Sequence, residues 1–393
     1  MKASKLTVGF LATIALLSVS CSDDDTGTIN VNNGGGQNPV VTPGATEIGG
    51  TLSSDLTLLA NSEYFLTSAL IVPNGKKLTI EPGVVVKSAT GSDVYIAVQQ
   101  GGMINAEGTS TNPIVLTSGS ATPNPGDWGG LIVLGKAPIN SVTGGNATST
   151  SEIGQLPYGG SFADDNSGII KYVRVEYSGG KADASSENNG FSFYGVGNKT
   201  VVEYIQAFAG KDDGVEFFGG TVNASFISVV DCEDDSVDWT EGFTGKLTNV
   251  YVEHGAEHDK GIEADGFNTD IGNNSNPKFW SFPTVEKLTI VGRGSSNETE
   301  AIRLRAGTRV ILNDVKIKGF EEAIDLDDED GENFTGEGVT SGETKITDII
   351  FEDVTVKLKN DTGATFTEAD LISGDGNGNG TDYDSWKTGW TRN

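Results

Sequence analysis

A five-residue phrase that recurs at a nearly constant spacing is the feature that most constrains how this chain can fold. The phrase starts with a small residue and then alternates apolar and polar side chains, as in Gly214–Phe218 (GVEFF). Successive copies start 24, 22, 25, 40 and 22 residues apart. Alternation with a period of two is typical of a β-strand, and a repeat of 22 to 25 residues is typical of a solenoid. The copies span residues 190–194, 214–218, 236–240, 261–265, 301–305 and 323–327.

A second apolar run begins 12 to 14 residues after the small residue of most copies, so each repeat carries at least two strands. The runs at 204–208, 226–230 and 315–317 are examples. One repeat alone could not bury its apolar face, whereas stacked repeats bury these faces together. A leucine-rich repeat has a similar period, but its leucine frame and its helical half are missing here. We therefore predict an all-β fold, a single-stranded right-handed parallel β-helix that forms a solenoid with capped ends.

The alignment of the copies predicts two inward rows of side chains. The large Trp239 beside the small Ala264 is the compensation that close packing requires. A slip of one residue would turn every inward side chain outward, so burial is expected to determine the register. The 40-residue spacing leaves the adjacency of Glu263 and Arg303 open, because a further coil could intervene near Leu288. The rows are Phe191, Val215, Val237, Ile262, Ile302, Ile324 and Phe193, Phe217, Trp239, Ala264, Leu304, Leu326.

The N-terminal residues have the features of an export signal. Lys2 and Lys5 precede an apolar run, residues 6–19, that is too short to span a membrane. Residues 1–20 are therefore predicted to be a signal peptide. With Cys21 at the expected cleavage site, the segment resembles a bacterial lipoprotein signal, in which the cysteine is acylated; conventional cleavage is the alternative. The acidic run that follows resembles the surface-export signal of Bacteroidetes lipoproteins.

This resemblance implies a lipid-anchored protein of the outer membrane that faces the extracellular side. Residues 21–49 are low in apolar content and rich in Gly and Asn, and we predict that they form a flexible tether. Residues 50–393 are predicted to form the β-helix domain, with insertions near 136–167 and 266–284. The tether would hold the domain away from the bilayer.

The charge balance limits the kind of partner. The chain has 55 acidic and 26 basic residues, which gives a net charge of −29. Nucleic-acid phosphates need Lys and Arg, so no nucleic-acid binding is expected, whereas divalent cations or cationic partners fit this surface. After Cys21 only Cys232 remains, so no disulfide can form within the mature chain. Cys232 ends an apolar run and is predicted to be a buried small residue.

Four segments resemble a family of Bacteroidetes β-helix lipoproteins. They are Gly126–Asn140, Asp164–Tyr177, Asp212–Asn223 and Trp386–Thr391. The resemblance covers most of the chain beyond residue 50 and implies location and fold, with no activity to transfer. The tryptophans of the last segment are expected to cap the last coil.

The outward positions of the repeated strand are the candidate ligand-binding residues. Strands of adjacent coils are about 4.8 Å apart, so stacked carboxylates repel by roughly 1 kcal/mol per pair in water. Arginines lying between acids could offset this repulsion, as could a calcium ion; a solvated acidic face is the plainer alternative. Two aromatic members suit sugar stacking unless an insertion covers them. The candidates are Tyr194, Glu216, Phe218, Asp238, Glu263, Asp265, Arg303 and Arg305 for the ligand, and Asp325, Asp327, Asp328 and Asp330 for calcium.

These features favour a surface-exposed outer-membrane lipoprotein that binds an extracellular glycan or peptide, as an accessory to a TonB-dependent nutrient importer. A β-helix polysaccharide lyase or glycoside hydrolase is the alternative, since Asp212–Asp213 and Asp234–Asp235 resemble pieces of pectin-degrading hydrolases. Those pieces stand in a different order here and a Gly-His-Gly element is missing, so no catalytic residue is assigned. A structural or adhesive surface protein is the third hypothesis.

Overall fold

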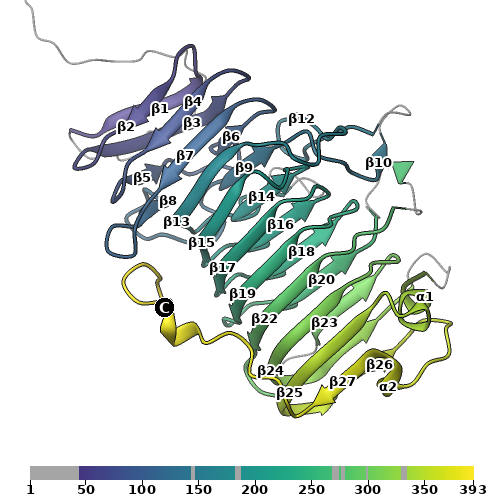
Figure 1. Cartoon of the computed structure of the whole chain (residues 1–393). Helices are drawn as coiled ribbons and strands as arrows, with labels where there is room; N and C mark the ends of the chain where they lie inside the picture. The colour runs from purple at the N-terminus through teal and green to yellow at the C-terminus, as the bar shows by residue number, and fades with distance from the viewer. Residues whose placement is uncertain are drawn as a thin grey trace, which may run out of the picture.

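Consecutive coils stack into one elongated solenoid in the computed structural model (Figure 1). The structure describes residues 44–142, 147–181, 187–267, 274–275, 279–297, 300–328 and 334–393. In this part of the chain, 23 strands are joined in one sheet system, and its coil-to-coil pairings are parallel. The predicted all-β fold, a parallel β-helix, is confirmed.

The repeated phrase forms the first row of strands, which pair in parallel from coil to coil. The alternation found in the sequence places one set of side chains inside the coils and the other set outside. The members of the first row lie in β1 (Thr46–Thr51), β3 (Glu63–Val72), β6 (Ile96–Val98), β9 (Leu131–Leu134), β14 (Phe191–Tyr194), β16 (Val215–Phe218), β18 (Val237–Thr240), β20 (Ile262–Asp265), β23 (Glu300–Arg305), the end of β24 (Ile311–Leu326) and β26 (Lys359–Asn360).

A second and a third row complete each full coil of the described residues, one more than the minimum of two that the sequence required. From β13 onward the two rows run through one strand that bends at a residue with positive φ, such as Tyr204 (55°), Phe226 (58°) or Asn249 (58°). The bend turns the chain around the core without a loop. The strands are β2 (Leu56–Leu58), β4 (Lys77–Ile80), β5 (Val85–Ser88), β7 (Met103–Glu107), β8 (Ile114–Ser118), β13 (Gly168–Glu176), β15 (Val201–Phe208), β17 (Asn223–Val230), β19 (Lys246–Glu253), β22 (Thr284–Val291), β25 (Lys345–Val356) and β27 (Ile372–Asp375), with parts of β1, β3 and β24.

Both predicted inward rows are buried in the register that the sequence indicates. Trp239 pairs with Ala264, and the Trp239 indole N–H donates to Thr308 Oγ1 at 3.0 Å. Glu263 pairs directly with Arg303. The segment near Leu288 therefore adds no coil of its own at the first row; it belongs to β22. Every member of the two rows is at most 1% exposed, so the interior is close-packed along the whole stack.

The two predicted insertions meet beside the first row. In the insertion 136–167, β11 (Ser149–Thr150) and β12 (Pro157–Tyr158) form an antiparallel pair. Its β10 (Ser141–Val142) pairs antiparallel with β21 (Asn274–Ser275) of the insertion 266–284. The insertion 136–167 covers part of the outer face of the first row, where Tyr158 packs on Tyr194.

The chain ends on short elements around the last coils. The first described strand, β1, starts at Thr46, four residues before the predicted start of the domain. At the other end lie α1 (Phe334–Ser341), α2 (Glu368–Leu371) and the short 3-10 turn η1 (Tyr383–Ser385). Among the described residues, we find no helix with the length and apolarity needed to cross a membrane.

The last residues, 376–393, run back along the outside of the stack and are here called the C-terminal strap (Figure 1). The backbone N–H of Thr381 donates to Thr289 Oγ1 at 3.0 Å. Further along, Tyr383 stacks on Tyr251 of β19 with ring centroids 3.7 Å apart. The strap therefore runs from β22 past β19, opposite to the order in which the coils follow one another in the sequence.

The prediction that the two terminal tryptophans cap the last coil is wrong. Trp386 lies edge-on against Phe226 of β17, with ring centroids 5.6 Å apart. Trp390 is fully buried and lies edge-on against Tyr204 of β15, at 5.9 Å. Stacked aromatic side chains at the bends of these strands offer an apolar surface in the middle of the solenoid, and the strap covers it.

Candidate functional site

An acidic groove with a volume of about 420 Å³ lies on the outer side of the first row. The turns before β16, β18 and β20 end in Asp212–Asp213, Asp234–Asp235 and Asp259–Lys260, each followed by a small residue. Because the coils repeat about every 4.8 Å, equivalent positions of these turns lie next to one another. Within the described residues, the groove is lined by Glu152, Glu187, Asn189, Asp212, Asp213, Glu216, Asp234, Asp235, Asp238, Asp259, Lys260, Glu263, Arg303 and Arg305.

Two of these acids connect successive turns. Asp213 Oδ1 accepts a hydrogen bond from the backbone N–H of Asp235 at 3.1 Å. Asp235 Oδ1 in turn accepts one from the backbone N–H of Lys260 at 2.8 Å. Each carboxyl oxygen accepts a backbone N–H of the next turn, so these two acids have a structural role in stacking the coils.

Basic side chains compensate the acids at the C-terminal end of the groove. Lys260 Nζ lies 3.1 Å from Glu263 Oε1. Arg305 contacts two acids at once, with Nη2 at 2.5 Å from Glu263 Oε2 and Nε at 2.5 Å from Asp265 Oδ1. Arginine cross-linking of the acidic ladder, one of the alternatives from the sequence, is present at this end.

The acids toward the N-terminal end lie beside one another, with Asp212 and Asp213 buried and Glu216 and Asp238 half-buried. Burial, reinforced by neighbouring carboxylates, raises the pKa of Asp212 to about 9. The same two causes raise the pKa values of Asp213, Glu216 and Asp238 well above their ordinary range. The amide of Asn189 donates to Glu216 Oε2 at 2.6 Å. This end of the groove can stabilise positive charge, because a cation would remove the cost of burying like charges together.

The two aromatic candidates, Tyr194 and Phe218, are buried. Each is 2% exposed, and their rings stack with centroids 3.9 Å apart. Tyr158 of the insertion 136–167 packs on Tyr194 at 4.8 Å and donates its hydroxyl to Glu241 Oε2 at 2.6 Å. Covering by an insertion, the alternative from the sequence, is what is observed. The prediction of a sugar-stacking face at these rings is wrong, because the insertion supplies apolar side chains that exclude solvent from them.

Asp325, the first of the predicted calcium residues, lies with acids other than those predicted. It is 2% exposed, and its carboxylate shares a cluster with Glu300 and Glu322. Lys359 Nζ lies 3.3 Å from Asp325 Oδ2 and 3.3 Å from Glu322 Oε2. An ammonium group is therefore already among these carboxylates.

The remaining predicted calcium residues point to separate partners. Arg303 Nη2 lies 2.6 Å from Asp327 Oδ2, and Asp328 Oδ1 accepts the backbone N–H of Thr335 at 2.9 Å. Asp330 lies outside the described residues. The three described acids therefore do not form one group of ligand oxygens. The reason is that β24 ends at Leu326 and the chain beyond it no longer follows the strand alternation.

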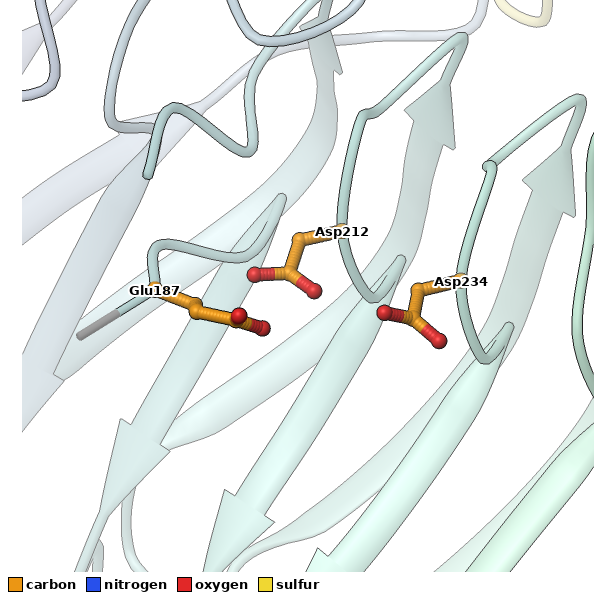
Figure 2. A group of neighbouring side chains, drawn as sticks. All are labelled: Glu187, Asp212 and Asp234. Carbon is orange, nitrogen blue, oxygen red and sulfur yellow. The ribbon is translucent and has the colours of Figure 1, made fainter. Parts of the chain in front are cut away.

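The turn acids Glu187, Asp212 and Asp234 were not predicted as site residues (Figure 2). A signal was present in the sequence, since an acidic pair twice stands immediately before the small residue of the phrase. The strand alternation predicts ligand-binding residues only at outward strand positions, whereas the turns next to them line the same groove. Cys232 is 2% exposed, which confirms its predicted burial.

The stacked coils and the groove define this molecule as a parallel β-helix protein with an acidic site on the outer face of one strand row. A family model described as a pectate-lyase-like β-helix domain matches residues 50–391, and the chain belongs to this family. No curated protein matches the chain. A solved structure, the Dettilon tailspike protein, matches over 78% of this chain and 61% of its own, with 10% identity and a TM-score of 0.28. The chain thus spans less than two thirds of that tailspike.

Proposed function

We propose that the protein is a surface-exposed, lipid-anchored outer-membrane protein that binds an extracellular glycan or peptide in the acidic groove, as an accessory to a TonB-dependent nutrient importer. The acidic groove is the observation that carries this proposal. The lipid anchor rests on the sequence around Cys21, which lies outside the described residues. A β-helix is suited to binding because its strands hold outward side chains at a repeated spacing.

The chemistry of the groove favours a ligand with positively charged groups. Ten carboxylates and three basic side chains line it among the described residues, and its aromatic neighbours are buried. A basic peptide or an amino-sugar glycan would place ammonium or guanidinium groups beside acids that now repel one another. Binding of this kind weakens with ionic strength.

Retention on immobilised ligands tests the proposal. The mature chain is passed over a panel of basic peptides, acidic peptides, amino-sugar glycans and neutral glycans at low and high salt. Asp238→Asn keeps the shape of a groove acid and replaces a carboxyl that can ionise beside a cationic group by a neutral amide, so retention of the bound class should fall at least tenfold. Asp164→Asn is the matched control, because Asp164 is an exposed acid that pairs with Lys199 at 2.7 Å outside the groove. Equal retention of both variants and of the wild type would contradict the groove as the binding site.

The anchor is tested separately by cell fractionation. Cys21→Ser should move the protein from the membrane fraction to the soluble fraction, and protease added to intact cells should digest the anchored wild type. An unchanged distribution of the Cys21→Ser variant would remove the anchor from the proposal and leave the groove untouched.

A glycan-cleaving enzyme is the second candidate, and one observation favours it. Glu216 and Asp238 lie on adjacent strands of an open groove, and burial raises their pKa values, as a general acid at neutral pH requires. A reducing-sugar and unsaturated-product assay on the same panel separates the candidates. Products indicate an enzyme, retention without products indicates a binding protein, and neither indicates a structural role.

A further inference from the structure

Several asparagines of this chain are followed directly by a glycine. The backbone nitrogen that follows an asparagine can attack the carbonyl carbon of the asparagine side chain, and glycine leaves the approach open because it has no side chain. Whether the attack occurs depends on how each glycine N–H is held by the fold. The steps within the described residues are Asn74–Gly75, Asn189–Gly190, Asn377–Gly378 and Asn379–Gly380.

Three of these glycines donate their N–H to an acceptor. The N–H groups of Gly75 and Gly190 donate to backbone carbonyl oxygens, at 2.9 Å and 2.8 Å. The Gly380 N–H donates to Asp314 Oδ1 at 3.1 Å. A donated N–H keeps its proton and its direction, so these three nitrogens are held away from the asparagine side chains.

The step Asn377–Gly378 at the start of the C-terminal strap lacks this protection. Among the described residues, the Gly378 N–H has no hydrogen-bond acceptor and the Asn377 side-chain amide has no hydrogen-bond partner. Asn377 is exposed to water, and it lies between β27 and η1 in a segment without helix or strand. Asn379 is exposed as well, so the donated N–H of its glycine is what distinguishes the two neighbouring steps.

We propose that Asn377 is a site of spontaneous modification, at which the chain takes up water and releases ammonia without an enzyme. The Gly378 nitrogen loses its proton to solvent and bonds to Asn377 Cγ, and the bond from Cγ to Nδ2 breaks as ammonia leaves. Water then opens the resulting five-membered succinimide ring, giving its hydroxyl to one carbonyl carbon and its proton to the Gly378 nitrogen. Opening at Cγ yields aspartate, and opening at the main-chain carbonyl carbon yields isoaspartate.

The modification would alter the point where the strap leaves the last coils. Both products carry a new negative charge, and isoaspartate lengthens the main chain by one atom. The Gly376 N–H donates to the Ile349 carbonyl oxygen at 2.7 Å on one side of Asn377, and the Asn379 N–H donates to Asp314 Oδ1 at 2.7 Å on the other. An extra atom between these two fixed points changes the path of the chain, so isoaspartate would weaken the first contacts of the strap. The proposal does not depend on what the groove binds.

Peptide mapping of the folded, full-length mature chain tests the proposal. The chain is incubated at mildly alkaline pH in water enriched in heavy oxygen and is then digested at acidic pH, which prevents modification during the work-up. Asn377 should lose ammonia, take up the heavy oxygen and yield both products at least tenfold faster than Asn74, Asn189 or Asn379. Asn377→Gln should remove the product, because a glutamine must close a larger ring. An unmodified Asn377, or equal rates at the four steps, would overturn the proposal.

Asp314→Gly tests the role of the donated N–H. Asp314 has a φ of 57°, which glycine adopts without strain, and its replacement removes the acceptor of the Gly380 N–H. Asn379 should then be modified at least tenfold faster than in the wild type, with Asn74 and Asn189 unchanged as internal controls. An unchanged rate at Asn379 in the folded variant would contradict the protection by hydrogen bonding. If the variant does not fold, the comparison of the four steps in the wild type decides alone.

Discussion

Trp390 in the C-terminal strap offers the sharpest test of how the solenoid is held together. The side chain is fully buried although only three residues of the sequence follow it. Its ring centroid lies 5.7 Å from that of Tyr172 and 5.9 Å from that of Tyr204, both edge-on. Its indole N–H donates to the carbonyl oxygen of Trp386 at 2.7 Å. The ring therefore connects the strap to two adjacent coils, β13 and β15.

Trp390→Ala should lower the free energy of unfolding by about 3–5 kcal/mol, the range for deleting a large buried aromatic side chain. The end of the strap should also detach. Arg174 Nη1 donates to the Trp390 carbonyl at 2.7 Å, and the Arg392 backbone N–H donates to Gln206 Oε1 at 2.7 Å. The bond from the charged Arg174 is worth about 1.5–3 kcal/mol and the neutral one about 1 kcal/mol in net terms, so we expect the strap to detach when the buried ring is lost.

Urea unfolding followed by circular dichroism gives the stability, and hydrogen exchange of the Arg392 amide reports the strap directly. The amide should be protected in the wild type and exchange rapidly in Trp390→Ala. Phe162→Ala is the matched control, because Phe162 is 61% exposed and its loss should change stability by no more than about 0.5 kcal/mol. Stability within about 1 kcal/mol of the wild type, together with a still-protected Arg392 amide, would refute the argument that Trp390 anchors the strap.

Three further predictions concern the core and the insertion. Ala264→Leu should destabilise the protein by about 1–3 kcal/mol in urea, because Trp239 of the adjacent coil already fills the space; a neutral effect would contradict the tight packing of this row. Tyr158→Phe should cost about 1.5–3 kcal/mol, since the phenol donates to the buried Glu241 carboxylate. Burial and Glu241 raise the Tyr158 pKa well above its ordinary value, whereas the phenol of the unfolded chain ionises near pH 10. The free energy of unfolding should therefore fall as the pH rises past 10, because only the unfolded state then loses the proton. This fall should be less steep in Tyr158→Phe than in the wild type. Burial raises the pKa of the Cys232 thiol to about 12, so Ellman's reagent at pH 8 should react with it only after unfolding, and rapid reaction in the native state would show that the coil opens there.

The strand rows were predictable from the sequence because alternation is a local property. A side chain two residues along a strand faces the same side, so the alternation within the phrase predicts which residues lie inside. The spacing between copies of the phrase predicts which residues of adjacent coils stack. Phe193, Phe217 and Trp239 were assigned to one inward row on that basis and lie there. The same logic identified Glu216 and Asp238 as outward neighbours.

The segments that cover the strand rows could not be predicted from the alternation. Tyr194 and Phe218 occupy outward positions of the repeated phrase, yet Tyr158 of the insertion packs on Tyr194 and covers the stacked pair. The insertion has no periodic pattern from which this contact could be predicted. The strap likewise runs back along several coils, and its Trp390 packs against aromatic side chains of β13 and β15. Such contacts join the repeated strands to segments outside the repeat, so the spacing of the repeat cannot predict them.

By itself, the sequence determined the repeat, the inward rows, the register between coils and the acidic character of one face, because each of these follows from neighbours a constant number of residues apart. Only the tertiary structure decided which acids form a site. Glu187, Asp212 and Asp234 belong to turns rather than strands, and their oxygens meet because three successive coils place those turns at the same position around the coil, one above another. Turns carry no side-to-side alternation, so the direction in which their side chains point depends on the folded path of the chain.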